Sequence, residues 1–202
     1  MVLDVGGGNG DFLAFCGIDG IVLETLLGSD VTEIDSPKCQ FVKYAGGTLP
    51  LRDRAVRTVV CLDALEHVPA QLRETFLEEL RRVSDDRVTM TFPADSQSLY
   101  SVLLLVTRLY RRLGLNAVAE RNLKEHMRFG LPRSEEVISS FVDSGWRVDS
   151  IREFSRLASF TMLVQYLLPF LAFRCLDRTL AHFLTKVSHG GTSYTYLTAC
   201  RQ

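Results

Sequence analysis

The sequence lacks an excess of either charge. Its 202 residues include 23 Lys and Arg against 24 Asp and Glu, which leaves a formal net charge of −1. That balance excludes the electrostatic footprint of a general nucleic-acid binder, although it does not exclude a specific nucleic-acid substrate. With 47% hydrophobic and 23% charged residues, the composition also excludes a disordered chain, a collagen and a coiled coil.

The five cysteines form no Cys-x-x-Cys pair and no Cys/His cluster, so we expect no metal site. Cys61 stands in an apolar run and is expected to be a small core residue. The chain opens directly on a strand-like run, residues 1–5, with no basic segment before it. We therefore expect no signal peptide and a cytoplasmic, reducing setting. A strand at this point needs cover from elsewhere in the chain or from a partner, unless the chain is a shortened form.

Strand-like and helix-like runs alternate in the first half of the chain. Helical patterns begin at 11–15, continue or restart over 20–27, and recur over 69–83. Strand-like runs cover residues 2–5, 31–34, 41–44, 57–62 and 87–92. Such alternation is typical of βαβ units around a parallel sheet.

The second half is less regular. The pattern predicts helices over 98–112 and 134–143, a strand over 146–154, and a last strand over 193–200 that is rich in β-forming residues. Between the last two strands lies a long apolar stretch.

A glycine loop follows the first strand, with glycines at alternate positions 6, 8 and 10. Glycine lets the backbone turn tightly and approach a ligand without a Cβ clash. The spacing is neither the Gly-x-Gly-x-x-Gly of dinucleotide folds nor a phosphate-binding loop, so it suits a ligand without a pyrophosphate. This spacing disfavours a nicotinamide enzyme.

Three motifs stand in order along the chain. They are Val2-Leu-Asp-Val-Gly-Gly-Gly-Asn-Gly10, Val31-Thr-Glu-Ile-Asp35, and a run over 59–69 that contains Leu65-Glu66-His67. Together they resemble the class I S-adenosylmethionine-dependent methyltransferases, and the last triplet resembles one large branch of that family. The resemblance covers residues 1 to about 93 well, and 125–155 more loosely.

The resemblance implies a fold and a division of the chain. The expected fold is α/β: a Rossmann-like, doubly wound, mostly parallel seven-stranded sheet with an antiparallel last strand and a helical insertion. Residues 1–202 form one domain, with a cofactor-binding half over 1–93 and a substrate-side half over 94–202. The helical insertion is expected over about 156–190.

The resemblance also assigns S-adenosylmethionine as the cofactor. Its implied binding residues are Asp4, Gly6, Gly8, Gly10, Asp35, Gly47 and Asp63. A carboxylate at Asp35 can accept both ribose hydroxyls, with Glu24 as a weaker rival. The alternative for Asp35 is a helix-capping role, and the alternative for the glycine loop is an ordinary turn.

Two features depart from the family pattern. An acidic residue that often contacts the adenine amine after the third strand is missing, because 44–47 reads Tyr-Ala-Gly-Gly, so that contact is absent or made by backbone. Arg57 replaces the acidic residue that commonly opens the fourth strand. These departures support a second hypothesis: a non-catalytic protein of the same fold that acts as a binding or regulatory partner.

Methyl transfer needs few side chains, because an in-line displacement depends on positioning. A base is required only when the acceptor loses a proton. His67, just after the fourth strand, is the catalytic candidate, and its alternative is a structural hydrogen bond at the next helix. His126 is the second candidate.

The segment 157–173 contains no charged residue, yet it is short for a membrane span and is interrupted by Gln165 and Pro169. We expect it to cover the crevice, or to contact a second copy or a membrane surface, rather than to span a bilayer. With the apolar run over 99–109 it favours a small, lipid-like acceptor.

Overall fold

The structure, a computed structural model, describes residues 1–8, 10–25, 39–44, 47–94, 112, 128–155 and 192–202. Asp35, His126, the apolar segment 157–173 and nearly all of the helix expected over 98–112 lie outside these ranges. Within the described ranges, no helix is long and apolar enough to cross a membrane.

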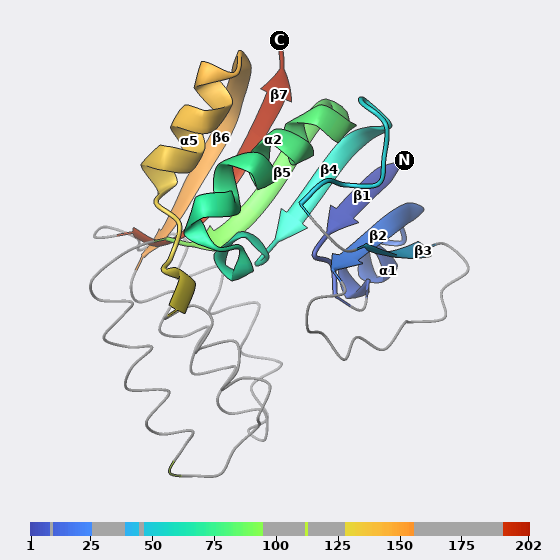
Figure 1. Cartoon of the computed structure of the whole chain (residues 1–202), viewed down its shortest axis with the longest axis horizontal. Helices are drawn as coiled ribbons and strands as arrows, with labels where there is room; N and C mark the ends of the chain where they lie inside the picture. The colour runs from blue at the N-terminus through green and yellow to red at the C-terminus, as the bar shows by residue number, and fades with distance from the viewer. Residues whose placement is uncertain (9, 26–38, 45–46, 95–111, 113–127, 156–191) are drawn as a thin grey trace.

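Seven strands of the described chain form one mixed sheet in the order β3-β2-β1-β4-β5-β7-β6 (Figure 1). Strands β1 to β5 pair in parallel, and β7 runs antiparallel between β5 and β6. The Rossmann-like sheet with an antiparallel last strand agrees with the sequence prediction. The strands are β1 (Val2–Val5), β2 (Gly20–Thr25), β3 (Cys39–Tyr44), β4 (Val56–Leu62), β5 (Ser84–Pro93), β6 (Trp146–Ser155) and β7 (Thr192–Arg201).

The second strand corrects the sequence analysis. We expected a helix over 20–27, but Gly20–Thr25 is β2, paired in parallel with both β1 and β3. The helix before it, α1 (Asp11–Cys16), ends at Gly17, whose φ of 66° is left-handed. The chain therefore leaves α1 early, and the β-branched Ile21 and Val22 enter the sheet, where Val22 is fully buried.

Helices cover both faces of the sheet. Helices α2 (Arg73–Val83) and α5 (Ser134–Asp143) lie side by side on one face (Figure 1). Helix α1 lies on the other face, where Gly20 leaves room for Leu13: a Cβ at Gly20 would come within 2.7 Å of Leu13 Cδ1. The sheet is thus doubly wound, as expected from βαβ units.

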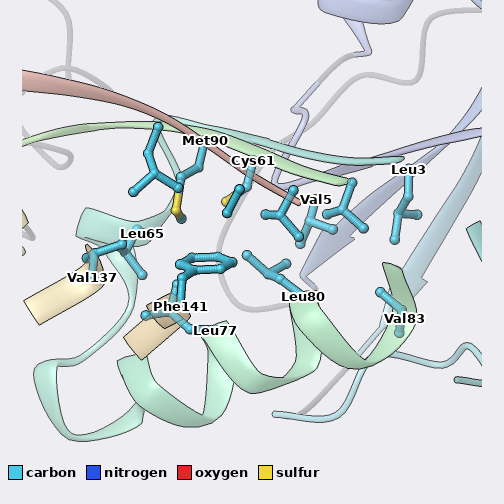
Figure 2. Packing of buried hydrophobic residues seen from close by; sticks show 14 of the residues in the cluster. Leu3, Val5, Cys61, Leu65, Leu77, Leu80, Val83, Met90, Val137 and Phe141 are labelled. Carbon is cyan, nitrogen blue, oxygen red and sulfur yellow. The ribbon is translucent and has the colours of Figure 1, made fainter. Parts of the chain in front are cut away.

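The main core lies between the sheet and the pair α2 and α5 (Figure 2). Leu3 and Val5 of β1 point toward Leu80 of α2, because alternate residues of a strand face the same side. Cys61, expected as a core residue, is fully buried here. Phe141 of α5 fills the space between the two helices and the sheet.

A buried arginine fastens α2 to α5. Arg81 makes an ion pair of 2.9 Å with Glu74 of its own helix, and its guanidinium donates to the Ser140 hydroxyl of α5. Its guanidinium carbon also lies 5.4 Å from the centre of the Phe141 ring. Since these partners of its guanidinium belong to α2 and α5, Arg81 fixes the packing of the two helices on one another.

Replacing Phe141 by Ala is expected to lower the free energy of unfolding by about 3–5 kcal/mol, because the ring is fully buried and leaves a cavity. Val142 is the matched control on the same helix. It is 53% exposed, and Val142→Ala is expected to change stability by less than about 0.5 kcal/mol. Urea unfolding followed by circular dichroism measures both, and equal losses would contradict the packing described.

Candidate functional site

The site lies where the direction of winding reverses. Strand β1 is flanked by β2 on one side and β4 on the other. After β1 the chain crosses one face of the sheet, and after β4 it crosses the opposite face (Figure 1). In open α/β sheets a crevice for ligands forms at such a point, beyond the carboxyl ends of the strands. The glycine loop follows β1 here, and the triplet Leu65–His67 follows β4 as the short helix η1.

The first glycine brings these two loops together. Gly6 has a φ of 75°, and its N–H donates to the Leu23 carbonyl of β2 at 2.8 Å. A Cβ on Gly6 would lie 2.5 Å from the Cβ of Ala64, the residue before η1. Only glycine permits both the left-handed backbone and this approach.

The next two glycines differ in what surrounds them. A Cβ on Gly7 would lie 2.5 Å from Cγ of Asp4, so the fully buried Asp4 carboxyl sits directly beneath the loop. Gly8 has a φ of 54°, and among the described residues no atom lies within 4 Å of the place its Cβ would take. The loop is therefore closed on the side of Asp4 and open at Gly8.

The other two glycines that were predicted to bind the cofactor, Gly10 and Gly47, lie in different surroundings. Gly10 has a φ of 77° and begins α1, where its carbonyl accepts from the Ala14 N–H at 3.0 Å. Gly47 is exposed, in the loop between β3 and β4. The same loop is anchored to α2 by Glu79, which accepts from the Leu49 N–H at 2.7 Å, and by Arg82, which donates to the Leu49 carbonyl at 3.0 Å.

Glu24 stands at the carboxyl end of β2. Val5 of β1 pairs with Leu23, so Glu24 is the first β2 residue beyond the end of β1, and it pairs with Lys43 of β3. The sequence analysis expected Asp35 at this place, the carboxyl end of the second strand. Asp35 is outside the described residues, and its role stays a prediction.

Asp63 directly follows β4 and has an unusual backbone. Its φ of 52° is left-handed, which is uncommon for a residue other than glycine. Two hydrogen bonds hold it against Thr91 of β5: its N–H donates to the Thr91 carbonyl at 3.1 Å, and the Thr91 hydroxyl donates to its carboxylate at 3.0 Å. Desolvation raises the pKa of Asp63, while the Thr91 hydrogen bond and His67 act in the opposite direction.

The three residues of the triplet Leu65–His67 differ in burial. Leu65 is fully buried in the main core, Glu66 is 3% exposed, and His67 is half-buried. Burial, reinforced by the nearby Asp63 carboxylate, raises the pKa of Glu66 to about 8, although Arg73 acts in the opposite direction. At neutral pH this side chain is therefore mostly a neutral carboxylic acid.

Arg73 ties this turn to the segment that leads into α5. Its Nε donates to the Val68 carbonyl at 3.1 Å, and its Nη2 donates to the carbonyls of Phe129, at 3.2 Å, and Gly130. The segment before α5 lies at the edge of the sheet where β4 and β5 end (Figure 1). Arg73 thus joins two chain segments at this edge of the sheet.

The sequence analysis missed three residues of this region. Glu66 was noted only as part of a motif, and Arg73 and Thr91 were not singled out. Burial of Glu66 depends on the η1 turn, and the hydrogen bonds of Arg73 to Phe129 and Gly130 span more than fifty positions, so no local pattern marks these residues. For Thr91 the sequence held one indication. It lies in a strand that is expected to be buried, and an acidic residue, Asp63, follows the neighbouring strand.

No family model matches the chain, and no curated protein matches it either. Solved structures do match. A SAM-dependent methyltransferase from Archaeoglobus fulgidus is 17% identical, covers 99% of this chain and 85% of its own, and superposes with a TM-score of 0.60.

Two further structures are similar. Magnesium protoporphyrin IX methyltransferase from Synechocystis PCC 6803, with bound SAH, is 16% identical over 100% of this chain and 74% of its own, with a TM-score of 0.56. The [4+2]-cyclase SpnF is 16% identical over 99% and 73%, with a TM-score of 0.59. The chain has the fold of SAM-dependent methyltransferases. The presence of a cyclase among these neighbours means that this fold does not by itself fix the reaction.

The raised pKa of Glu66 predicts a stability that falls with pH. An unfolded glutamate loses its proton near 4.5, and Glu66 in the folded chain near 8, so the folded state holds the extra proton between these values. The free energy of unfolding then falls as pH rises through this window, by up to about 1.4 kcal/mol per unit.

Glu66→Gln is expected to remove that slope between pH 5.5 and 7.5, measured by urea unfolding. Glu78, exposed on α2, is the matched control, and Glu78→Gln is expected to keep the slope of the original chain. A slope that survives in Glu66→Gln would show that another group causes it.

Proposed function

We propose that the chain is a methyltransferase that binds S-adenosylmethionine in the crevice between the glycine loop and η1. The observation that carries the proposal is the glycine loop at the reversal point of the sheet. It is closed below by Asp4 and open at Gly8, which leaves a space that a Cβ would fill. The neighbour from Synechocystis, which has bound SAH, supports the choice of cofactor.

The described residues fit such a ligand by their chemistry. The backbone at Gly8 can approach a ligand closely, and the carboxyl groups at the ends of β1, β2 and β4 offer acceptors for hydroxyl and amino groups. We assign the ribose hydroxyls to Glu24 rather than Asp35, because Glu24 is the first residue of β2 beyond the end of β1. Gly47 would contribute only backbone contacts.

The bound cofactor would supply a methyl group on a sulfonium, which an acceptor can attack in line. The chain's own residues would hold and orient the two reactants. His67, on η1 beside Asp63, is our candidate for taking a proton from the acceptor at an imidazole nitrogen. Its electrostatic interaction with Asp63 lowers the pKa of that carboxyl, against the larger effect of desolvation.

The acceptor is proposed to be small and lipid-like, on the strength of the apolar runs over 99–109 and 157–173. The second run is proposed to cover the crevice, or to contact a second copy of the chain or a membrane surface. Arg57, which departs from the family pattern, is paired with Asp86 at 3.3 Å on an exposed part of the sheet. This pairing gives Arg57 a surface role.

The second candidate is a non-catalytic protein of the same fold. The observation that favours it is the missing acidic residue after β3. Calorimetric titration with S-adenosylmethionine separates the two: micromolar binding supports the methyltransferase, and no binding at millimolar concentration supports the non-catalytic partner.

Gly8→Val is expected to weaken SAH binding at least about tenfold, because the added side chain takes up the open space in the crevice. The control is Gly145→Val. Gly145 has a similarly positive φ of 78° and equally open surroundings, but it lies beyond α5. Both variants carry the same backbone strain, so a loss of affinity in both would assign the effect to strain and contradict the proposed site.

Glu24→Ala is expected to weaken SAH binding by roughly ten- to a hundredfold, the contribution of hydrogen bonds between a carboxylate and the two ribose hydroxyls. Asp35→Ala is expected to change it little. Isothermal titration calorimetry measures both. The reverse ranking would return the ribose role to Asp35.

A further inference from the structure

We propose that Arg73 is a positioning residue for His67: it anchors the end of η1, so that this short helix is held on both sides and the place of its imidazole is fixed. The inference rests on the proposed function in one respect, the role of His67 as the group that takes a proton from the acceptor. It adds a residue that acts on the reaction through His67 and not through contact with the reactants.

The start of η1 is held by the glycine loop and by the core. Ala64, the residue before η1, lies so close to the loop that a Cβ at Gly6 would come within 2.5 Å of the Ala64 Cβ. Leu65, the first residue of η1, is fully buried in the main core. These two contacts fix where the turn begins, and His67 comes at its other end.

The turn itself has few hydrogen bonds. η1 is three residues long. The His67 N–H donates to the Ala64 carbonyl at 3.1 Å, and the Val68 N–H donates to the Leu65 carbonyl at 3.1 Å. Hydrogen bonds of a 3₁₀ turn have poor geometry, so such short turns are weak on their own. The position of His67 therefore depends on what holds the end of the turn.

Arg73 supplies that second anchor. Its Nε donates to the carbonyl of Val68, the residue after His67, at 3.1 Å. Its Nη2 donates to the carbonyls of Phe129, at 3.2 Å, and Gly130. Because Nε and Nη2 belong to one planar guanidinium, the three carbonyls lie around a single rigid group. The end of η1 is thus attached to the segment before α5.

That segment is itself fastened to the sheet. Leu131, the next residue after Gly130, is 4% exposed. Ser134, the first residue of α5, shares a hydrogen bond of 2.6 Å with the hydroxyl of the fully buried Thr195 of β7. Arg73 therefore connects the end of η1 to a part of the chain that β7 and the core hold in place.

An arginine suits this task, and a lysine does not. The guanidinium presents several N–H groups in a fixed fork, whereas an ammonium is a compact point charge on a flexible stem. A lysine at position 73 keeps the positive charge but cannot hold the carbonyls of Val68 and Gly130 together in the same way. Arg73→Lys therefore separates the geometry of the anchor from its charge.

The test is the chemical reactivity of His67 in Arg73→Lys. Diethyl pyrocarbonate modifies the neutral imidazole, and mass spectrometry of the digested protein gives a rate constant for His67 alone. His67 is half-buried in the original chain. Arg73→Lys is expected to raise this rate constant by roughly tenfold, the factor that corresponds to the loss of one hydrogen bond from a charged donor. An unchanged rate constant would overturn the inference.

Arg81→Lys is the matched control on the same helix. Arg81 fastens α2 to α5 through Glu74 and Ser140, and its replacement loosens this packing without removing an anchor of η1. We expect it to change the rate constant of His67 by less than about twofold. An equal rise in both variants would assign the effect to a general loss of stability and overturn the inference.

A rescue experiment uses Arg73→Ala. Ethylguanidinium can enter the space left by the side chain and donate to the same carbonyls, so it is expected to slow the modification of His67 in this variant. Ethylammonium at the same concentration is expected to have no such effect, because it lacks the fork. Equal effects of the two salts, or an effect of neither, would contradict the role assigned to the guanidinium.

A further measurement needs no variant and holds even if the substitutions at Arg73 prevent folding. The Leu72 N–H closes a second 3₁₀ turn, η2 (Ala70–Leu72), by donating to the Pro69 carbonyl at 2.8 Å. The Val68 amide is expected to exchange with solvent at least about tenfold more slowly than the Leu72 amide, because the turn it closes is anchored on both sides. Equal exchange of the two amides in the original chain would overturn the inference.

The failure of this inference can be told from the failure of the proposed function. An original chain that binds no S-adenosylhomocysteine in a calorimetric titration would overturn the proposed function, whereas the reactivity of His67 would still decide whether Arg73 anchors η1. Binding of S-adenosylhomocysteine together with an unchanged reactivity in Arg73→Lys would overturn the inference alone.

Discussion

The contact between Gly6 and Ala64 is the constraint on which the site depends. It brings the loop after β1 against the turn after β4, at the point where the two strands send the chain to opposite faces. A Cβ at Gly6 would separate the two loops. This contact sets the distance between the loop after β1, which lies over Asp4, and the turn that leads into η1. The positions of the polar groups on the loop and on η1 therefore depend on how closely these two backbone segments pack.

The apolar framework explains why charged groups can be held here. Leu3, Val5, Cys61 and Leu65 extend the main core along β1, β4 and η1 (Figure 2). Asp4 and Glu66, which follow Leu3 and Leu65 along the chain, are buried, and burial raises the pKa of Glu66. Desolvation also raises the pKa of Asp63, although part of that residue is exposed. Two adjacent shifted carboxyls are typical of a functional site more than of a surface.

The fold was largely predictable from sequence, and the site only in part. A continuous apolar run marked β4, the helical recurrence of apolar residues marked α5, and a high content of β-forming residues marked β7. The prediction failed at β2, because the run over 20–27 was interpreted as a continuation or restart of the preceding helix, whereas α1 ends at Gly17. The glycine loop was recognisable from local spacing. The roles of Glu66, Thr91 and Arg73 were not, because burial and hydrogen bonds between residues far apart in the chain create them.

Both a cyclase and methyltransferases have folds similar to that of this chain, so the side chains at the site, and not the sheet, determine the reaction. The sheet accounts for a crevice and for a loop that a ligand can approach. Which ligand binds and which reaction follows depend on the groups around that loop, among them the buried carboxyl groups of Asp4 and Glu66. Arg73 donates hydrogen bonds to three carbonyls, so its guanidinium joins the turn after β4 to the segment before α5 at the same edge of the sheet. Side chains brought there from distant parts of the chain, and not the order of the strands, distinguish one reaction of this fold from another.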